Sequence, residues 1–295
     1  MKIADDWVDY KILATSDGMK LENWKGVILL RPDPQVIWKG RDLYAESGIN
    51  AVYHRSEKGG GGWETRKSFP AEWTVNYKDL TFKIKPMGFK HTGLFPEQAV
   101  NWNEIRRLIS LAKERDKNRE IKVLNLFAYT GAASVACAKA GAVVTHVDAA
   151  KGMVERAGEN ARLSGVESGI RYIIDDCNKF VARELRRGNR YDGIIMDPPS
   201  YGRGPGGEMW KIERDLFAFV QTCAKLLSEK PLFFLINSYT TGLQPAVLKN
   251  ILTLALKDFK GDAQAYEVGI ATEEGIPLPC GASGLFTGEG YGKRA

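Results

Sequence analysis

The stretch IKVLNLFAYTGAASVACAKAGAVVTHVD, residues 121–148, decides the fold of this chain. It begins with a mostly apolar run, 121–127, that is typical of a buried strand. A turn that contains Gly131 follows, and the small helix formers after it predict a helix over 132–140. A second β-branched run then leads to Asp148. The stretch therefore predicts a strand, a tight turn, a helix and a second strand that ends in an acid.

The turn and the acid of this unit predict a ligand site. In a right-handed βαβ unit, the turn and the end of the second strand meet at one edge of the sheet. A turn glycine lets a ligand approach the backbone, and the helix N-terminus offers N–H groups. Asp148 lies 17 positions after Gly131 (148 − 131), where its carboxylate can accept both hydroxyls of a ribose. Because the dinucleotide pattern G-x-G-x-x-G is absent, an ordinary βαβ unit with an exposed Asp148 is the alternative.

Composition limits the classes of protein to which the chain can belong. The 295 residues are 44% hydrophobic and 26% charged, which predicts a soluble globular protein with one large or two smaller domains. No apolar run reaches membrane-spanning length, and the N-terminus is unlike a signal peptide. The four cysteines lie far apart, so we expect no disulfide framework, no metal site and a reducing cytoplasmic location. A net charge of +6 permits a polyanionic partner without requiring one.

The chain divides by its pattern into three parts. Residues 1–90 carry five of the seven tryptophans and short β-rich runs, which predict a small antiparallel β region. We favour a cap that covers a sheet edge over a substrate platform with aromatic stacking surfaces. Residues 91–120 form a linker loop and a helix, and His91 in that loop is interpreted as a solvated residue rather than a general base. Residues 121–295 form the main α/β domain.

Strands and helices alternate from residue 121 onward, which predicts an α/β fold with a mostly parallel, seven-stranded sheet covered by helices on both faces. The predicted strands are 121–127, 142–147, 170–174, 191–196, 232–236, 263–272 and 282–287. Four strand ends carry a turn glycine or an acid: Gly131, Asp148, Asp176 and Asp197. Open α/β sheets bind ligands at their carboxyl edge, so these four groups together predict a binding site there.

These motifs resemble those of the class I S-adenosylmethionine-dependent methyltransferases, most closely the branch that contains the bacterial 23S ribosomal RNA large-subunit methyltransferases. The resemblance rests on NLFAYTGAASVACAKAGA (125–142), VDAAKGMVERAGENARLSG (147–165), DDCNKF (175–180), DPPSYG (197–202) and GFKHTGLFPEQ (88–98). It covers residues 85–290 and implies a Rossmann-like fold with S-adenosylmethionine as cofactor. The motifs are far more specific for the cofactor than for the substrate.

The resemblance implies a cofactor role for several residues. The loop Phe127, Ala128, Tyr129, Thr130 and Gly131 would pass under the methionine part of the cofactor. Asp148, with Ala149 beside it, would bind the ribose hydroxyls, and Asp176 would accept from the adenine amine next to Cys177. Thr92, Gly93, Leu94 and Phe95 would help to close the site. Asp197 would face both the cofactor and the target atom.

The catalytic candidates are Asp197, Pro198, Pro199, Ser200 and Tyr201. The sulfonium of the cofactor already carries an activated methyl group, so holding the nucleophile in line supplies much of the rate. A carboxylate or a main-chain carbonyl at this turn can accept the N–H bonds of a nitrogen nucleophile. Proline removes a donor, which leaves the carbonyls of the turn free to face a substrate. The alternative is that these prolines merely end a strand.

The favoured function is methylation of a nitrogen of an RNA base, with guanine of ribosomal RNA as the first choice. The resemblance and the basic helix predicted over 179–190 support an RNA partner, although that helix is also readily explained as a solvated face. The alternatives are a methyltransferase acting on a protein or small molecule, and a cofactor-binding protein without catalysis. Carbon-5 of cytosine is not expected as the target. In the relatives that modify this carbon, a cysteine follows the fifth strand or lies in the motif after the fourth, where this chain has Asn237-Ser238 and Ser200, and Cys137 and Cys223 are expected to be buried in helices. The sequence does not determine an oligomeric state.

Overall fold

The computed structural model describes residues 1–56, 60–88, 90–203 and 209–292. Contacts within the chain define two compact units, and each contains two segments. The first unit consists of Met1–Val100 and Val268–Cys280, and the second of Asn101–Glu267 and Gly281–Ala295. None of the helices in the described ranges is both long and apolar enough to cross a membrane.

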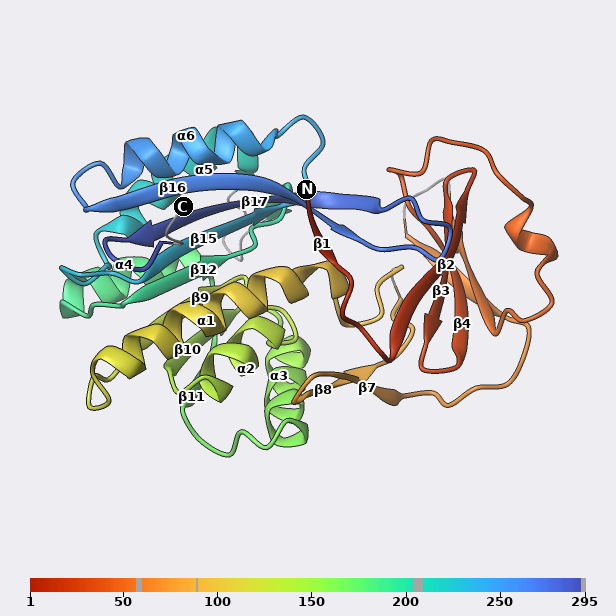
Figure 1. The fold of residues 1–295 in the computed structure, drawn as a ribbon, viewed down its shortest axis with the longest axis horizontal. Coiled ribbons are helices and arrows are strands. Elements are labelled where there is room, and N and C mark those ends of the chain that lie inside the picture. Colours follow the sequence, from red (N-terminus) through yellow and green to blue (C-terminus); the bar gives the residue numbers. More distant parts are fainter. Residues whose placement is uncertain (57–59, 89, 204–208, 293–295) are drawn as a thin grey trace. The chain divides into compact units, whose positions relative to one another are not determined.

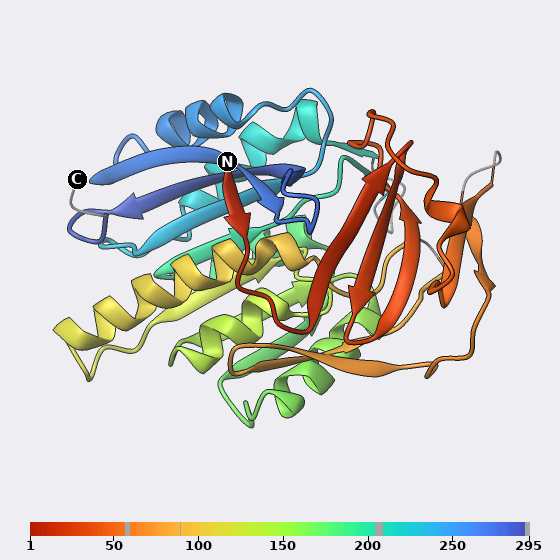
Figure 2. The ribbon, with the colours of Figure 1, turned by 45° about the vertical axis from the view of Figure 1, so that its right-hand side comes forward.

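The first unit is built around a five-stranded sheet with the order β2-β3-β4-β5-β6. Its strands are β2 (Tyr10–Ser16), β3 (Met19–Trp24), β4 (Val27–Pro32), β5 (Ala51–Arg55) and β6 (Gly61–Thr65). Neighbouring strands are antiparallel, except that β4 and β5 pair in parallel. Two-residue turns with positive φ, Asp17-Gly18 and Lys25-Gly26, join β2, β3 and β4 into adjacent hairpins (Figure 2). The β-rich character predicted for the start of the chain is therefore confirmed.

The smaller elements of the first unit include a strand pairing with the C-terminal segment. They are β1 (Lys2–Ala4), the hairpin of β7 (Trp73–Tyr77) and β8 (Leu80–Ile84), and the 3-10 helices η1 (Leu43–Ala45) and η2 (Pro96–Gln98). Residues 268–270 pair in parallel with β1, and Glu274 accepts a hydrogen bond from the backbone N–H of Thr15 at 2.8 Å. Residues from near the C-terminus thus complete a unit that begins at the N-terminus.

The seven predicted strands lie in one mostly parallel sheet, in which β1 is an eighth strand beside β16, so the predicted number is one too low. The seven are β9 (Lys122–Leu126), β10 (Val143–Asp148), β11 (Ile170–Ile174), β12 (Gly193–Met196), β15 (Phe233–Ser238), β16 (Gly261–Ile270) and β17 (Leu278–Gly288). The order is β1-β16-β17-β15-β12-β9-β10-β11, and β15, β12, β9, β10 and β11 run in parallel. Strand β17 is antiparallel to β15. The Rossmann-like fold class is confirmed.

Helices cover both faces of this sheet (Figure 1). They are α1 (Ala99–Arg115), α2 (Ala132–Lys139), α3 (Lys151–Leu163), α4 (Cys177–Arg187), α5 (Ile212–Ala224) and α6 (Pro245–Ala255). Successive residues of a strand face opposite sides of a sheet. Leu124 and Leu126 accordingly join the core under α4, α5 and α6, while Val123 joins the core under α1 and α2. This double burial explains why the strands read as continuous apolar runs.

A short antiparallel hairpin follows the fourth parallel strand. It consists of β13 (Tyr201–Arg203) and β14 (Met209–Lys211), with Gly202 opposite Trp210. The sequence predicted only a glycine-rich loop over 203–208, and residues 204–208 lie outside the described residues. The hairpin is the first element of the second unit that sequence patterns did not predict.

Candidate active site

The loop after β9 is held in an uncommon backbone conformation. Phe127, Tyr129 and Gly131 have φ values of 53°, 51° and 83°, in the left-handed region that non-glycine residues rarely adopt. A Cβ atom at Gly131 would lie only 2.6 Å from the Cβ of Ala157 on α3. Only glycine therefore lets the loop pack this closely on α3 just before α2 begins. Backbone strain of this kind persists only where the surrounding structure enforces it, often at a ligand site.

Asp148, the last residue of β10, supports this loop through main-chain hydrogen bonds. Its Oδ2 accepts from the N–H of Tyr129 at 2.8 Å, and its Oδ1 accepts from the N–H of Ala150 at 2.9 Å. The side chain remains partly exposed, and Ala149 beside it is exposed. Since a carboxylate has about four lone-pair sites, acceptor capacity remains for ligand hydroxyls.

Asp176 and Cys177 lie where β11 passes into α4. Asp176 caps the helix, with its Oδ1 accepting from the N–H of Lys179 at 2.9 Å. The Sγ of Cys177 accepts from the N–H of Phe127 at 3.3 Å, which ties the start of α4 to the loop after β9. Burial raises the pKa of Cys177 to about 12, so this thiol is protonated at neutral pH. The structure therefore brings the predicted loop, Asp148, Asp176 and Cys177 together.

A buried polar network lies behind the loop, and sequence patterns did not identify it. The Nδ2 of Asn125 donates to the Oγ of Ser134 at 2.9 Å, and that hydroxyl lies 2.9 Å from the Nδ1 of His146. Burial lowers the pKa of His146 to about 4, so the ring is neutral at neutral pH. The only signal in the sequence is a polar residue inside each of two apolar strands. The network joins β9, α2 and β10 directly beneath the strained loop.

The Asp197-Pro198-Pro199-Ser200 turn at the end of β12 is fixed from two directions. The indole N–H of Trp210 donates to the Pro199 carbonyl at 2.7 Å, and the N–H of Ile212 donates to the Ser200 carbonyl at 3.1 Å. The expectation that the carbonyls of this turn are free is therefore wrong for these two residues. The Pro198 carbonyl has no hydrogen bond from any residue in the described ranges, so it is the main-chain acceptor next to the Asp197 side chain.

Two hydroxyl groups meet beside this turn. The Oγ of Ser200 and the Oγ1 of Thr240 lie 2.6 Å apart, which links the loop after β12 to the loop after β15. Thr240 was not among the residues predicted for the site. Tyr201 is 57% exposed, and its hydroxyl donates to the Sδ of Met209 at 3.5 Å. The tyrosine ring is therefore accessible on the surface, as a stacking role would require.

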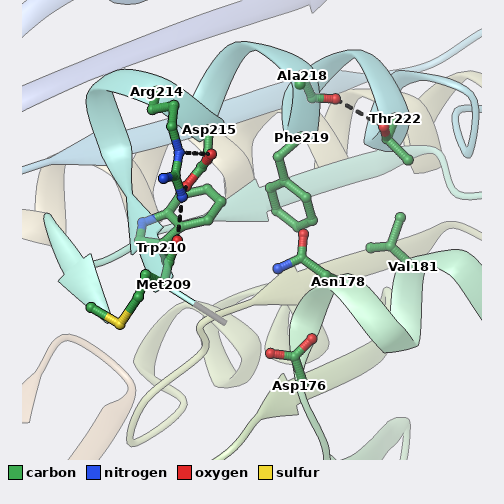
Figure 3. A pocket seen from close by; sticks show the side chains of 10 residues that line it. All are labelled: Asp176, Asn178, Val181, Met209, Trp210, Arg214, Asp215, Ala218, Phe219 and Thr222. Carbon is green, nitrogen blue, oxygen red and sulfur yellow. Dashed lines mark hydrogen bonds and ion pairs between the residues drawn. The ribbon is translucent and has the colours of Figure 1, made fainter. Parts of the chain in front are cut away.

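A cavity of about 360 Å³ opens beside Asp176 (Figure 3). It is lined by residues from α4, β14 and α5: Asp176, Asn178, Val181, Met209, Trp210, Arg214, Asp215, Ala218, Phe219 and Thr222. The rings of Phe127, Trp210 and Phe219 form a triangle, with centroids 5.7–5.9 Å apart. A carboxylate at one end and aromatic walls suit a flat, amine-bearing ring such as a purine.

The remaining predicted cofactor residues, Thr92 to Phe95, lie in the first unit. Thr92 is fully buried, and its carbonyl accepts from the N–H of Lys85 at 3.1 Å. His91 is only partly exposed and contacts Phe95 edge-on, so it is not the fully solvated residue expected. Burial and the nearby Arg31 and Lys90 lower the pKa of His91 to about 4. The predicted closing role of Thr92 to Phe95 stays a prediction.

Comparisons with known proteins agree on the class of protein to which the chain belongs. The family model described as S-adenosylmethionine-dependent methyltransferase matches residues 51–229. The Ribosomal RNA large subunit methyltransferase K/L of Pseudoalteromonas atlantica is 32% identical over 197 residues. That alignment covers 66% of this chain but only 26% of the relative, so the chain spans a small part of the curated relatives it matches.

Solved structures extend the likeness to nearly the whole chain. The S-adenosylmethionine-dependent methyltransferase of Agrobacterium tumefaciens is 30% identical, with a TM-score of 0.88 over 97% of this chain and 93% of that one. The tRNA m1G37 methyltransferase of M. jannaschii is 13% identical, with a TM-score of 0.54 over 94% of this chain and 74% of that one. The second likeness concerns the fold alone.

Proposed function

The chain belongs to the S-adenosylmethionine-dependent methyltransferase family, and we propose that it methylates a nitrogen of an RNA base, with a guanine of ribosomal RNA as the favoured target. The observation that carries the nitrogen assignment is the turn at Asp197. Two of its carbonyls accept hydrogen bonds within the protein, the Pro198 carbonyl accepts none from the described residues, and the proposal uses that carbonyl together with the Asp197 carboxylate. Two such acceptors suit the N–H groups of an amine better than an oxygen nucleophile.

The cofactor residues act by holding the methyl donor. Bound S-adenosylmethionine supplies an electrophilic methyl group on a sulfonium. In the proposal, Asp148 accepts from the ribose hydroxyls while its own main-chain bonds keep the loop in place. Asp176 accepts from the adenine amine at the end of the cavity that Phe219 and Trp210 line. The loop from Phe127 to Gly131, with Ala149 beside Asp148, would hold the methionine part.

Methyl transfer then requires orientation of the acceptor. The site must place the base nitrogen in line with the methyl group and the sulfur. As the N–C bond forms and the S–C bond breaks, the nitrogen releases one N–H proton, and the Asp197 carboxylate is the proposed acceptor of that proton. Asp197 and the Pro198 carbonyl orient the nitrogen through its N–H bonds. Tyr201, with its exposed ring, stacks on the planar target. Ser200 and Thr240 hold the turn against the next loop through their hydroxyls.

The cysteines argue against methylation of carbon-5 of cytosine. That reaction needs a thiolate to add to the ring. All four cysteines are free thiols, and Cys137 and Cys223 are buried in helices, as expected. Burial raises the pKa of Cys137, Cys177 and Cys223 above the ordinary value, which disfavours a thiolate at each. Four separate thiols also suit the reducing cytoplasm in which we place the enzyme.

The first test is methyl transfer from radiolabelled cofactor. Total RNA, total protein and a metabolite extract from a strain that lacks the gene are incubated separately with the purified enzyme. We expect label in RNA and, after digestion, in a base-methylated guanosine. Label only in protein or in a metabolite would support the alternative substrate classes, and no label in any fraction would support a cofactor-binding protein without catalysis. A 5-methylcytosine product would contradict the assignment of the nucleophile.

Asp197→Ala tests the role of the turn. We expect kcat and kcat/KM to fall together by about 100-fold or more, because the lost interaction is made mainly in the transition state. Cofactor affinity should be largely kept, since Asp148 and Asp176 remain. Asp258→Ala, at an exposed aspartate of the same unit, is the matched control. Normal turnover of Asp197→Ala, or loss of the cofactor as severe as in Asp148→Ala, would contradict the proposed role.

A further inference from the structure

Trp210 makes a directed contact with the acceptor turn. Its ring Nε1 donates to the Pro199 carbonyl at 2.7 Å, across the β13–β14 hairpin in which Trp210 pairs with Gly202. Proline restricts the backbone φ angle, so a hydrogen bond to the Pro199 carbonyl fixes most of the remaining freedom of this peptide. The position of the indole and the geometry of the turn are therefore linked by one short hydrogen bond.

The same ring contacts the cofactor loop. Its centroid lies 5.9 Å from that of Phe127 and 5.7 Å from that of Phe219 on α5. Phe127 has a left-handed backbone, which costs free energy and needs support from neighbouring side chains. Trp210 and Phe219 supply that support by packing on the Phe127 ring. One side chain thus contacts both the strained loop and the turn that carries Asp197.

Trp210 also lines a cavity. Its ring forms part of the wall of the 360 Å³ cavity whose other end holds Asp176, as Figure 3 shows. A flat ring bound in that cavity would pack against the indole and limit its movement. We propose that Trp210 is a positioning residue that couples occupancy of the cofactor cavity to the geometry of the methyl-acceptor turn. This inference rests on the proposed function, because it takes the Asp197 turn as the place where the acceptor binds.

The coupling follows from close packing. The indole cannot shift in the aromatic triangle without moving Phe127, and it cannot turn without breaking the bond to Pro199. Filling the cavity therefore restricts the turn, and an empty cavity leaves it more freedom. Trp210→Phe separates the two roles, since phenylalanine keeps an aromatic wall but has no N–H to donate.

Steady-state kinetics and cofactor calorimetry of Trp210→Phe test the link to the turn. We expect kcat to fall about 10-fold or more, with the Kd for S-adenosylhomocysteine changed by less than about 3-fold. Trp210→Ala should lower both kcat and the affinity for S-adenosylhomocysteine, because this substitution also removes the cavity wall. Trp73→Phe is the matched control: its indole also donates to a main-chain carbonyl, that of Trp24 at 3.0 Å, but it lies in the first unit. We expect it to leave both quantities unchanged.

Tryptophan emission tests the link to the cavity without any RNA. The S-adenosylhomocysteine-dependent change in emission should be present in the parent and in Trp73→Phe, and should be mostly lost in Trp210→Phe. An unchanged kcat in Trp210→Phe, equal losses of kcat and cofactor affinity, or an emission change that survives the substitution would each overturn the inference. Failure of the proposed function is distinguishable, because it appears as absence of label in RNA with the parent enzyme.

Discussion

Two carboxylates, one in each unit, differ in their burial and in the partners that surround them. Glu22 in the first unit is fully buried and accepts hydrogen bonds from the hydroxyl of Tyr10 and the Nη2 of Arg31, both at 2.7 Å. The Nζ of Lys20 lies 3.8 Å from the Oε1 of Glu22. The charged groups around Glu22 are the side chains of Arg31 and Lys20 in the same unit, so this carboxylate serves the stability of the first unit.

Asp148 in the second unit is arranged differently. Its carboxylate accepts hydrogen bonds from two main-chain N–H groups, those of Tyr129 and Ala150, and its side chain stays partly exposed. Main-chain donors hold the carboxylate in place without neutralising its charge. The comparison shows that the kind of partner, rather than the number of hydrogen bonds, separates a structural acid from an acid that is available to a ligand.

The largest expected effect is that of Asp148→Ala on cofactor binding. A hydrogen bond to a charged group contributes about 1.5–3 kcal/mol, so losing two ribose contacts should weaken binding by about 100-fold or more. The fold should survive, because the side chain is partly exposed. Calorimetry with S-adenosylhomocysteine measures the change, and Glu155→Ala on the exposed face of α3 is the control. Unchanged affinity in a folded Asp148→Ala variant would remove this residue from the site.

Glu22→Gln should have the complementary effect. Removing one partner of a buried ion pair leaves Arg31 uncompensated, which typically destabilises a protein by about 3–5 kcal/mol. Urea unfolding followed by fluorescence measures this loss, with Glu120→Gln at an exposed position as the control. The fraction that remains folded should bind S-adenosylhomocysteine normally. A Glu22→Gln variant as stable as the parent would break the distinction between the two carboxylates.

The pH dependence of stability should reflect the ion pair of Glu22 and Arg31. Burial alone would raise the pKa of Glu22, but the charges of Arg31 and Lys20 and the hydrogen bonds from Arg31 and Tyr10 lower it from 4.5 to about 2. A carboxyl with a lowered folded-state pKa stabilises the fold above its unfolded pKa, and that contribution is lost as the pH falls from 4.5 to about 2. The loss should be about 3 kcal/mol. Urea midpoints over this range should fall less steeply in Glu22→Gln than in the parent.

The smallest effect concerns the basic helix α4. Two of its arginines are committed to protein partners: Arg183 pairs with Asp175, and Arg187 with Glu184. Arg186 is exposed and has no partner among the described residues. If RNA phosphate binds here, Arg186→Gln should flatten the slope of log affinity against log salt by about 0.7–0.9, the value for one phosphate contact. Lys151→Gln on α3 is the control, and equal slopes would leave α4 as plain surface.

Much of the second unit could be predicted because its signals are local. Buried parallel strands read as apolar runs, and Gly131, Asp148, Asp176 and Asp197 follow four of them in order. The strand 170–174 is observed with the predicted bounds, and the other core strands differ by a few residues at their ends. Strand ends depend on hydrogen bonds to neighbours rather than on residue type, so their bounds are the least predictable feature.

The sequence by itself determined the mostly parallel sheet, the succession of strands and helices along the chain, and the family. Hydrophobic periodicity, turn residues and motifs lie within short stretches, so they can be identified without the structure. Only the tertiary structure decided which groups meet. Trp210 reaches Pro199 across 11 positions, Ser200 reaches Thr240 across 40, and residues 268–280 join a unit that begins at Met1. Such contacts leave no local pattern, because they arise from the packing of whole elements. The Pro199 carbonyl was expected to face a substrate, but it accepts a hydrogen bond from the indole N–H of Trp210 in the hairpin that follows.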